Sequence, residues 1–334
     1  MRDMSDRPTI VSGGRKREDT KEQHPGGLTR DHVVWAYRLL LDRDPENEDV
    51  IGPKLAGSRD TRELRNHLIT SAEFRDKNRD YAHTNERTIV IKEIGTGNGC
   101  VRLFVDLSDH IIGLNIVRGT YEHDEIAWVR NILKPGDIAL DVGAHIGFFT
   151  VQMAAMVGPA GRVLAFEPFD TNAELLERSV HENRFDARVL VSRAAVGAAS
   201  GSATLTFPVE TLNSGGAYLL RDGTAPLAGN LEKPVTKVAL DELELPRPVR
   251  FIKMDVEGAE PQVLEGASRL LKTDRPTILS ELHPTQLQRA SGVTADEFLT
   301  QVRRLGYRAH DLSGNALDRA PVDAIVSMAL VAVG

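Results

Sequence analysis

The stretch LDVGAHIG, residues 140–147, decides the fold, because it carries a buried strand directly into a glycine turn. The strand pattern is DIALDVG (137–143), and the apolar helical pattern FFTVQMAAMVG (148–158) follows the turn. Gly143 permits the tight turn, and Gly147 lets the helix pack close to the strand with its amide end toward a ligand. This unit predicts a ligand at the carboxyl end of the strand.

An acidic residue adds to this ligand signal. Glu167 ends the next strand pattern, RVLAFEP (162–168), twenty residues after Gly147. A carboxylate in that place can accept hydrogen bonds from both hydroxyls of a ribose. The ligand is therefore expected to contain an adenosine group.

His145 indicates which adenosine compound fits. A dinucleotide fingerprint, G-x-G-x-x-G, needs bare backbone against the pyrophosphate, but His145 replaces its second glycine and Phe148 its third. The turn therefore favours a ligand without phosphate, such as S-adenosylmethionine. Asp141 and Glu122 are candidates for its ammonium group, although Asp141 could instead bond to the turn and Glu122 could stabilise a helix start. The expected cofactor-binding residues are Glu122, Asp141, Gly143, Ala144, His145, Gly147 and Glu167.

Strands and helices alternate through the rest of the chain. Further helices are expected at 171–184 and 261–271, and further strands at 187–197, 251–258, 277–282, 306–312 and 324–333. This alternation predicts a mainly parallel sheet covered on both faces. The last two strands are joined by about a dozen residues without a helical pattern, so they are expected to form an antiparallel pair at the edge. The predicted fold class is α/β, a Rossmann-like class I methyltransferase with a seven-stranded sheet.

Candidate catalytic residues follow the fourth and fifth strands. FIKMDVEG (251–258) brings Asp255 and Glu257 to the end of one strand, on one side if the chain stays extended, and His283 follows the next. Methyl transfer to a hydroxyl needs a group that takes the proton of the acceptor, so Asp255 or Glu257 is the first choice of base, with His283 next. The structural alternatives are a bond from Asp255 to the turn, helix-start stabilisation by Glu257 and Glu260, and a strand end at His283.

Oxygen ligands at 255, 257 and 281 could also hold a magnesium ion that lowers the pKa of the hydroxyl. Nothing in their spacing requires the ion, so magnesium is possible but not indicated. The ten histidines form no H-x-x-x-H pair, which argues against zinc. No metal site is predicted.

Residues 198–250 form an insertion between the third and fourth strands that is longer than a crossover needs. The segment is rich in Gly, Ser, Asn and Pro, and it could cover the acceptor with Asn213, Ser214, Gly215, Gly216 and Tyr218 along its lining. The alternative is a surface hairpin.

The N-terminal part has a different character. Residues 1–27 are expected to be a disordered tail, and 28–82 a small helical module with helix starts at Thr29, Asp60 and Thr70. The phrases YRLLLDRDPENED and LITSAEFRD resemble a short helical domain found in bacterial surface and glycan-related proteins, which implies a docking or dimerising element. A β-hairpin, 88–94 with 101–106, then begins the third part, 83–334.

Composition limits the functional classes. A net charge of −7 argues against a protein that coats nucleic acid, and no segment approaches the apolar length of a membrane span. A single cysteine, Cys100, fits a reducing compartment. The expected location is the cytoplasm, with neither a nucleic acid nor a membrane as partner.

The motifs DVGAHIGFFT, VLAFEP, AVG, LDEL, FIKMDVEGAEPQVLEGA and LSELH, in this order, resemble the FkbM-type methyltransferases over roughly residues 115–285. The resemblance implies use of S-adenosylmethionine, usually to methylate hydroxyls of sugars or polyketide-type natural products. It implies cofactor roles for Asp141, Gly143, Gly147 and Glu167, and places Asp255, Glu257 and Gly258 at the reaction end. His145 replaces the small polar residue usual in the family's G-A-N-x-G turn.

Three functional hypotheses follow. The first is an S-adenosylmethionine-dependent O-methyltransferase acting on a sugar or a glycosylated or polyketide-type natural product. The second is an NAD-dependent oxidoreductase, against which His145 speaks. The third is a non-catalytic partner protein that binds S-adenosylmethionine and docks through residues 28–82.

Overall fold

The computed structural model describes residues 28–69, 71–77, 88–97, 99–208, 214–221, 223–320 and 324–333. The chain divides into two compact units, Met1–Asn85 and Glu86–Gly334. The predicted tail, residues 1–27, lies outside the described residues, as do Thr70 and Asn213.

The N-terminal unit is helical, as the capping patterns predict. It contains α1 (Arg30–Leu41), α2 (Glu48–Ala56), α3 (Thr61–Ile69) and α4 (Ala72–Lys77). The Asp60 carboxylate accepts a hydrogen bond from the Glu63 amide at 2.9 Å, which caps the start of α3. The apolar faces of the helices form a separate small core made of Leu28, Val33, Tyr37, Leu41, Ile51, Leu64 and Leu68.

The second unit is built on a seven-stranded sheet with the order β12-β13-β11-β10-β3-β4-β5. Its strands are β3 (Ile138–Val142), β4 (Arg162–Phe166), β5 (Val189–Ser192), β10 (Val249–Met254), β11 (Thr277–Leu282), β12 (Tyr307–Asp311) and β13 (Val326–Ala332). Strand β13 runs antiparallel to both of its neighbours, and the other pairs are parallel. The predicted Rossmann-like methyltransferase fold with an antiparallel edge is therefore confirmed.

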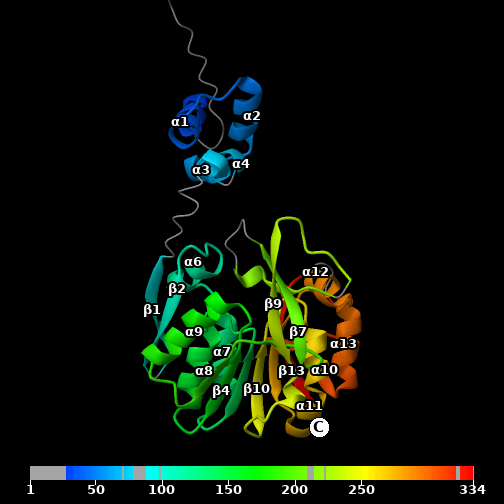
Figure 1. The fold of residues 1–334 in the computed structure, drawn as a ribbon. Helices are drawn as coiled ribbons and strands as arrows, with labels where there is room; N and C mark the ends of the chain where they lie inside the picture. The colour runs from blue at the N-terminus through cyan, green and yellow to red at the C-terminus, as the bar shows by residue number, and fades with distance from the viewer. Residues whose placement is uncertain are drawn as a thin grey trace, which may run out of the picture. The chain divides into compact units, whose positions relative to one another are not determined.

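Helices cover both faces of this sheet (Figure 1). On one face α7 (His123–Ile132), α8 (Phe148–Val157) and α9 (Asp170–Glu182) share an apolar core with the hairpin of β1 (Ile89–Gly95) and β2 (Cys100–Asp106). On the other face α10 (Glu260–Gly266), α11 (Ser268–Asp274) and α13 (Ala295–Arg304) form a second core. Both cores leave the carboxyl ends of the parallel strands free to build a site.

Two predicted elements are divided in the structure. The strand expected at 187–197 ends at Ser192, and β6 (Ala195–Val196) leaves the main sheet to pair with Lys237 and Val238. The helix expected at 261–271 breaks at Ala267 into α10 and α11. The two departures meet in space: a Cβ on Gly266 would lie 2.0 Å from the Gly197 carbonyl oxygen, so the end of α10 packs closely against the chain after β6.

The insertion forms a second, four-stranded sheet with the order β6-β9-β7-β8. Its long pair is β7 (Gly201–Pro208) with the antiparallel β9 (Asn230–Val238), and β8 (Tyr218–Leu219) adds to its edge. Phe207 of β7 packs against Phe169 before α9 with ring centroids 4.8 Å apart. The insertion is therefore more than the surface hairpin of the alternative interpretation. Within the described ranges, every helix is too short or too polar to cross a membrane.

Candidate active site

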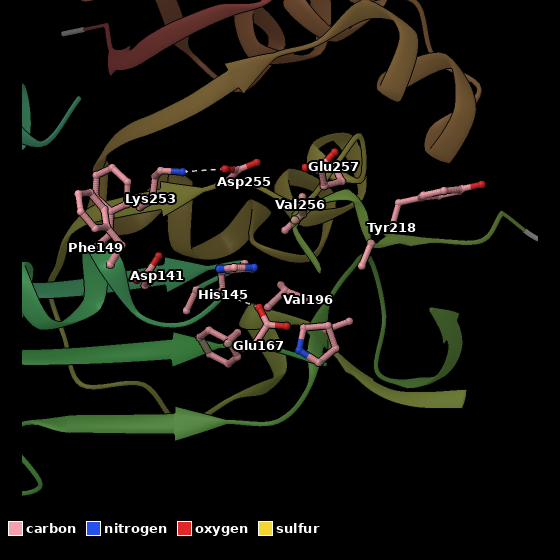
Figure 2. Close-up of a pocket in the computed structure, with 18 of the residues that line it drawn as sticks. Asp141, His145, Phe149, Glu167, Val196, Tyr218, Lys253, Asp255, Val256 and Glu257 are labelled. Atoms are coloured by element: carbon pink, nitrogen blue, oxygen red, sulfur yellow. Dashed lines mark hydrogen bonds and ion pairs between the residues drawn. The ribbon is translucent and has the colours of Figure 1, made fainter. Parts of the chain in front are cut away.

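A cavity of about 910 Å³ lies at the carboxyl ends of β3, β4 and β10. Figure 2 shows Lys253 and Asp255 on one side of it, Glu167 and Val196 on the other, and His145 between them. The insertion supplies Leu205 of β7 and Tyr218 of β8, among other lining residues. Segments that lie far apart in the sequence thus meet at one pocket.

The turn after β3 owes its shape to Gly143. This residue has φ 82°, and a Cβ there would lie 1.8 Å from the Asp255 carbonyl oxygen, so the turns after β3 and β10 pack backbone to backbone. His145 also adopts a left-handed conformation, with φ 51°. One expectation needs correction: at Gly147 a Cβ would collide with Leu176 of α9, so this glycine allows helix-to-helix rather than helix-to-strand packing, and it does not line the cavity.

Glu167 is held in place by two backbone amides. Its Oε2 accepts from the His145 amide and its Oε1 from the Phe169 amide, both at 2.8 Å. Burial raises the pKa of Glu167 to about 7, although both amides act in the opposite direction. Beside it, Phe166, Ala195, Val196 and Leu205 line the same cavity with apolar surface. A fixed carboxylate next to an apolar slot suits a nucleoside, because the sugar needs acceptors and the base needs apolar contact.

The other two predicted carboxylates also line the cavity. Asp141 is 1% exposed and accepts a hydrogen bond from the Thr150 hydroxyl in α8, so its protein partner is that helix and not the turn. Burial raises the pKa of Asp141 to about 6. Glu122 precedes α7 with φ 40°, but its side chain makes no capping hydrogen bond. Its carboxylate instead lies 3.9 Å from the Lys253 ammonium, and burial raises its pKa.

Lys253 is a central residue that the sequence reasoning missed. Its Nζ lies 3.1 Å from Asp255 Oδ2 and 4.8 Å from the centroid of the Phe149 ring (Figure 2). Burial lowers the pKa of Lys253, but the carboxylates of Asp255, Glu122 and Asp141 outweigh burial and raise it. The available signal was a charged residue inside FIKM, an otherwise apolar strand, because a buried charge needs a partner.

The chain after β10 does not stay extended, contrary to expectation. Glu257 has φ 54°, so it does not share the side of Asp255 as a strand residue would, and Gln286 donates a hydrogen bond to it. Burial, followed by the charge of Asp255, raises the pKa of Glu257 to about 9. The amides of the turn go to Glu260 instead, whose Oε1 accepts from Val256 at 3.2 Å and Gly258 at 3.4 Å. Of the two residues considered for helix-start stabilisation, Glu260 is therefore the one that accepts from the turn amides.

His283 and Glu281, at the end of β11, lie outside the lining of the main cavity. His283 precedes α12 (Pro284–Gln286), and its buried Nδ1 has no partner among the described residues. Glu281 lines a smaller cavity of about 340 Å³ that shares Glu122, Lys253 and Asp255 with the main one. Burial raises the pKa of Glu281 to about 7. The described residues contain no group of three or more His, Cys, Asp or Glu placed to hold a metal.

The charges of the main cavity are strongly unequal. Its described lining carries five carboxylates but a single lysine or arginine, Lys253; the acids are Glu122, Asp141, Glu167, Asp255 and Glu257. His145 adds no positive charge near neutral pH, because burial lowers its pKa to about 4. Burial is the first cause of the raised pKa values of Glu122, Asp141, Glu167 and Glu257, and repulsion from neighbouring carboxylates adds to it. Such a wall favours a cationic ligand.

Comparison with known families agrees with this geometry. The family model described as Methyltransferase FkbM domain matches residues 141–309, half of the chain. The chain belongs to this family. The FkbM resemblance carried by its motifs is thereby confirmed, and the matched range begins at Asp141 and includes Glu167, Lys253 and Asp255.

Several known proteins are similar to this FkbM-family chain. The AMB antimetabolite synthetase AmbE of Pseudomonas aeruginosa is 27% identical over 252 residues, which are 61% of this chain and 11% of that protein. The chain thus spans about a tenth of the length of this relative. A crystal structure of Methyltransferase FkbM from Methylobacillus flagellatus is 15% identical, with a TM-score of 0.38 over 68% of this chain and 55% of that one. A SAM-dependent O-methyltransferase from Thermotoga maritima is 16% identical, with a TM-score of 0.39 over 73% and 78%.

Proposed function

We propose that the chain transfers a methyl group from S-adenosylmethionine to a hydroxyl of a sugar, or of a glycosylated or polyketide-type natural product. The observation that carries the proposal is the acidic wall of the cavity, whose described lining holds five acidic side chains and a single ammonium. This wall attracts a ligand with a sulfonium and an ammonium group and repels a diphosphate. It therefore argues for S-adenosylmethionine and against a nicotinamide dinucleotide.

The residues that would hold this cofactor follow from their positions. Glu167, oriented by two amides, would accept from the ribose hydroxyls, and the apolar slot at Ala195 and Val196 would take the adenine. Asp141 and Glu122 also line the cavity, and their carboxylates would bind the ammonium group of the cofactor. When bound, S-adenosylmethionine supplies a methyl group on a positively charged sulfur, which keeps the bonding electrons as the methyl leaves.

Asp255 is the proposed base. The Lys253 ammonium, 3.1 Å away, fixes its carboxylate in the wall of the cavity. Glu257 is a poorer choice because its pKa of about 9 keeps it protonated near neutral pH. Lys253 holds its own proton, since its pKa is raised. Asp255 would take the hydroxyl proton while the new oxygen–carbon bond forms.

The acceptor is proposed to lie under the insertion, where Gly215, Tyr218 and Leu219 line the cavity. A small natural product is consistent with the AmbE relative, which is an antimetabolite synthetase. Residues 28–82 are proposed as a separate docking or dimerising module, because their helices have a core of their own. Magnesium is not part of the proposed reaction.

The test combines binding and turnover. Isothermal titration should detect S-adenosylmethionine and S-adenosylhomocysteine but not NADH. Asp255→Asn should lower methyl transfer to a panel of methyl glycosides and polyketide alcohols by about 10²- to 10⁴-fold with the affinity for S-adenosylhomocysteine retained. The exposed Asp186→Asn is the matched control. If the wild-type chain does not bind S-adenosylmethionine, the proposal is wrong. If Asp255→Asn keeps full activity, Asp255 is not the base.

A further inference from the structure

A second cavity, of about 720 Å³, lies beside the proposed cofactor cavity. Its walls come from β1, the end of α6 (Ile112–Arg118), α7 and α8. Tyr121 and Phe148 line both cavities, and their rings meet edge to face with centroids 5.1 Å apart. This aromatic pair is a shared partition between the two cavities.

The lining of the second cavity is partly apolar and partly cationic. Ile116, Ile126 and Phe148 supply buried apolar surface. Lys92 and Arg130 supply two cations, and Glu93 is the one acidic side chain among the described lining residues. The neighbouring cavity has the opposite excess of charged groups, so the two cavities suit ligands of opposite charge.

Arg130 is the central group here. Its Nη2 donates to the Gly95 carbonyl at 2.7 Å and to Gln152 Oε1 at 3.2 Å, and both acceptors are neutral. Its Nε is buried and has no hydrogen-bond partner within the described part of the chain. A guanidinium with neutral partners and an unused donor keeps its full positive charge for an incoming anion.

The other charged groups around the cavity support this assignment. The Lys92 ammonium donates to the Val117 carbonyl at 2.8 Å, and neither Lys92 nor Arg130 forms an ion pair with a described carboxylate. Glu93 also lines the cavity, but its carboxylate lies 3.3 Å from the Arg102 guanidinium on β2. A half-buried arginine without a counter-charge is costly unless a ligand supplies one.

We propose that this cavity binds an anionic group, a carboxylate or a phosphate, carried on a small apolar body. Arg130 would bind the anion and Lys92 would add charge, while Ile116, Ile126 and Phe148 would contact the apolar body. Tyr121 and Phe148 separate this cavity from the cofactor cavity, so we assign the anion to a ligand of its own and not to the methyl acceptor, which is proposed to lie under the insertion.

The test is calorimetric titration of the full-length chain with three probes: phenylacetate, phenyl phosphate and the neutral 2-phenylethanol. At least one of the two anions should bind, and 2-phenylethanol should not. The anion that binds more tightly shows whether the cavity prefers a carboxylate or a phosphate. Arg130→Gln should weaken anion binding by about tenfold or more, since a charged hydrogen bond is lost. Lys92→Gln, at the edge, should weaken it by about threefold. The exposed Arg250→Gln is the matched control and should bind as the wild type does.

Saturation with S-adenosylhomocysteine separates this inference from the proposed function. Anion binding should persist in its presence, because the anion has its own cavity. Competition between the two, equal binding of the alcohol, or unchanged affinity in both Arg130→Gln and Lys92→Gln would overturn the inference while leaving the cofactor assignment intact. Anion binding through Arg130 in a chain that binds no S-adenosylhomocysteine would support the anion site and overturn the proposed function alone. Circular dichroism verifies that Arg130→Gln is folded, and Lys92→Gln provides the test if it is not.

Discussion

The turns after β3 and β10 begin alike and end in different chemistry. An Asp-Val pair ends β3 at Asp141 and Val142, and another directly follows β10 at Asp255 and Val256. Each turn then passes through left-handed residues, Gly143 and His145 in the first, Glu257 and Gly258 in the second. In the first turn the acids have donors within the protein: Thr150 for Asp141 and two amides for Glu167. The carboxyl groups of Asp141 and Glu167 are therefore held in position before any ligand binds.

The second turn is electrostatically unbalanced. Lys253 is the cation between Asp255 and Glu122, while Glu257 and Glu281 have pKa values raised to about 9 and about 7. Burial is the first cause of both shifts, and repulsion from Asp255 is the second. Two turns that share left-handed residues can therefore form different ends of a pocket. The cofactor end has acids that already accept hydrogen bonds from the protein, and the reacting end has acids that repel one another's charge. Three experiments test this difference between the two ends.

The largest effect is expected where the turns touch. Gly143→Ala should destabilise the larger unit by about 2–5 kcal/mol, because it combines backbone strain at φ 82° with a collision against the Asp255 carbonyl. Gly119→Ala is the matched control: its φ is 75° but the space around it is open, so a loss of about 1–2 kcal/mol is expected. Urea unfolding measures both. Equal losses would show that the contact between the turns has no energetic weight.

A smaller effect should distinguish the two ends by cofactor affinity. Glu167→Ala should weaken S-adenosylhomocysteine binding by about 10- to 100-fold, since it removes the acceptor that the amides of His145 and Phe169 hold in place. Asp255→Ala should change that affinity by less than about threefold, because the reacting end contributes little to a ligand without a sulfonium. Titration calorimetry measures both values. If the two variants lose affinity equally, the division of the pocket into two ends is wrong.

The smallest effect is a pH dependence that only the charged cofactor should show. Glu257 and Glu281 are protonated below their raised pKa values and ionise as pH rises toward about 9 and about 7. A sulfonium binds the ionised form better, so the affinity ratio of S-adenosylmethionine to S-adenosylhomocysteine should rise by roughly three- to tenfold between pH 6 and 8.5. In Glu257→Gln this rise should shrink, since one titrating group is gone. A ratio that falls with pH would contradict the sign.

Local pattern was enough to predict much of the fold. The glycine turn at 143–147, the strands around it and the antiparallel end of the sheet follow from periodicity and turn residues that lie close together in sequence. The departures arise from contacts between distant segments. Strand β6 leaves the sheet for β9, and the helix after β10 breaks where Gly266 meets Gly197, and neither partner is visible in the local sequence.

The same limit on what the sequence can predict applies to the site. Asp141, Glu167 and Asp255 could be predicted because each stands at the end of a strand pattern, where ligands of such sheets bind. Lys253 stands inside a strand, so its importance appears only when Glu122 and Asp255 are seen beside it. His283 follows its strand in the same manner as the others, yet the chain turns into α12 there and leaves it out of the cavity lining.

The carbonyl oxygen of Asp255 fills the space that a side chain at position 143 would need. The turns after β3 and β10 are therefore packed backbone to backbone, and a change in the path of one requires a change in the other. Tyr218 and Leu219 of the second sheet border the pocket outside this contact, so substitutions there can reshape the pocket without disturbing it. Engineering of acceptor choice should begin at those positions and keep the joined loops constant.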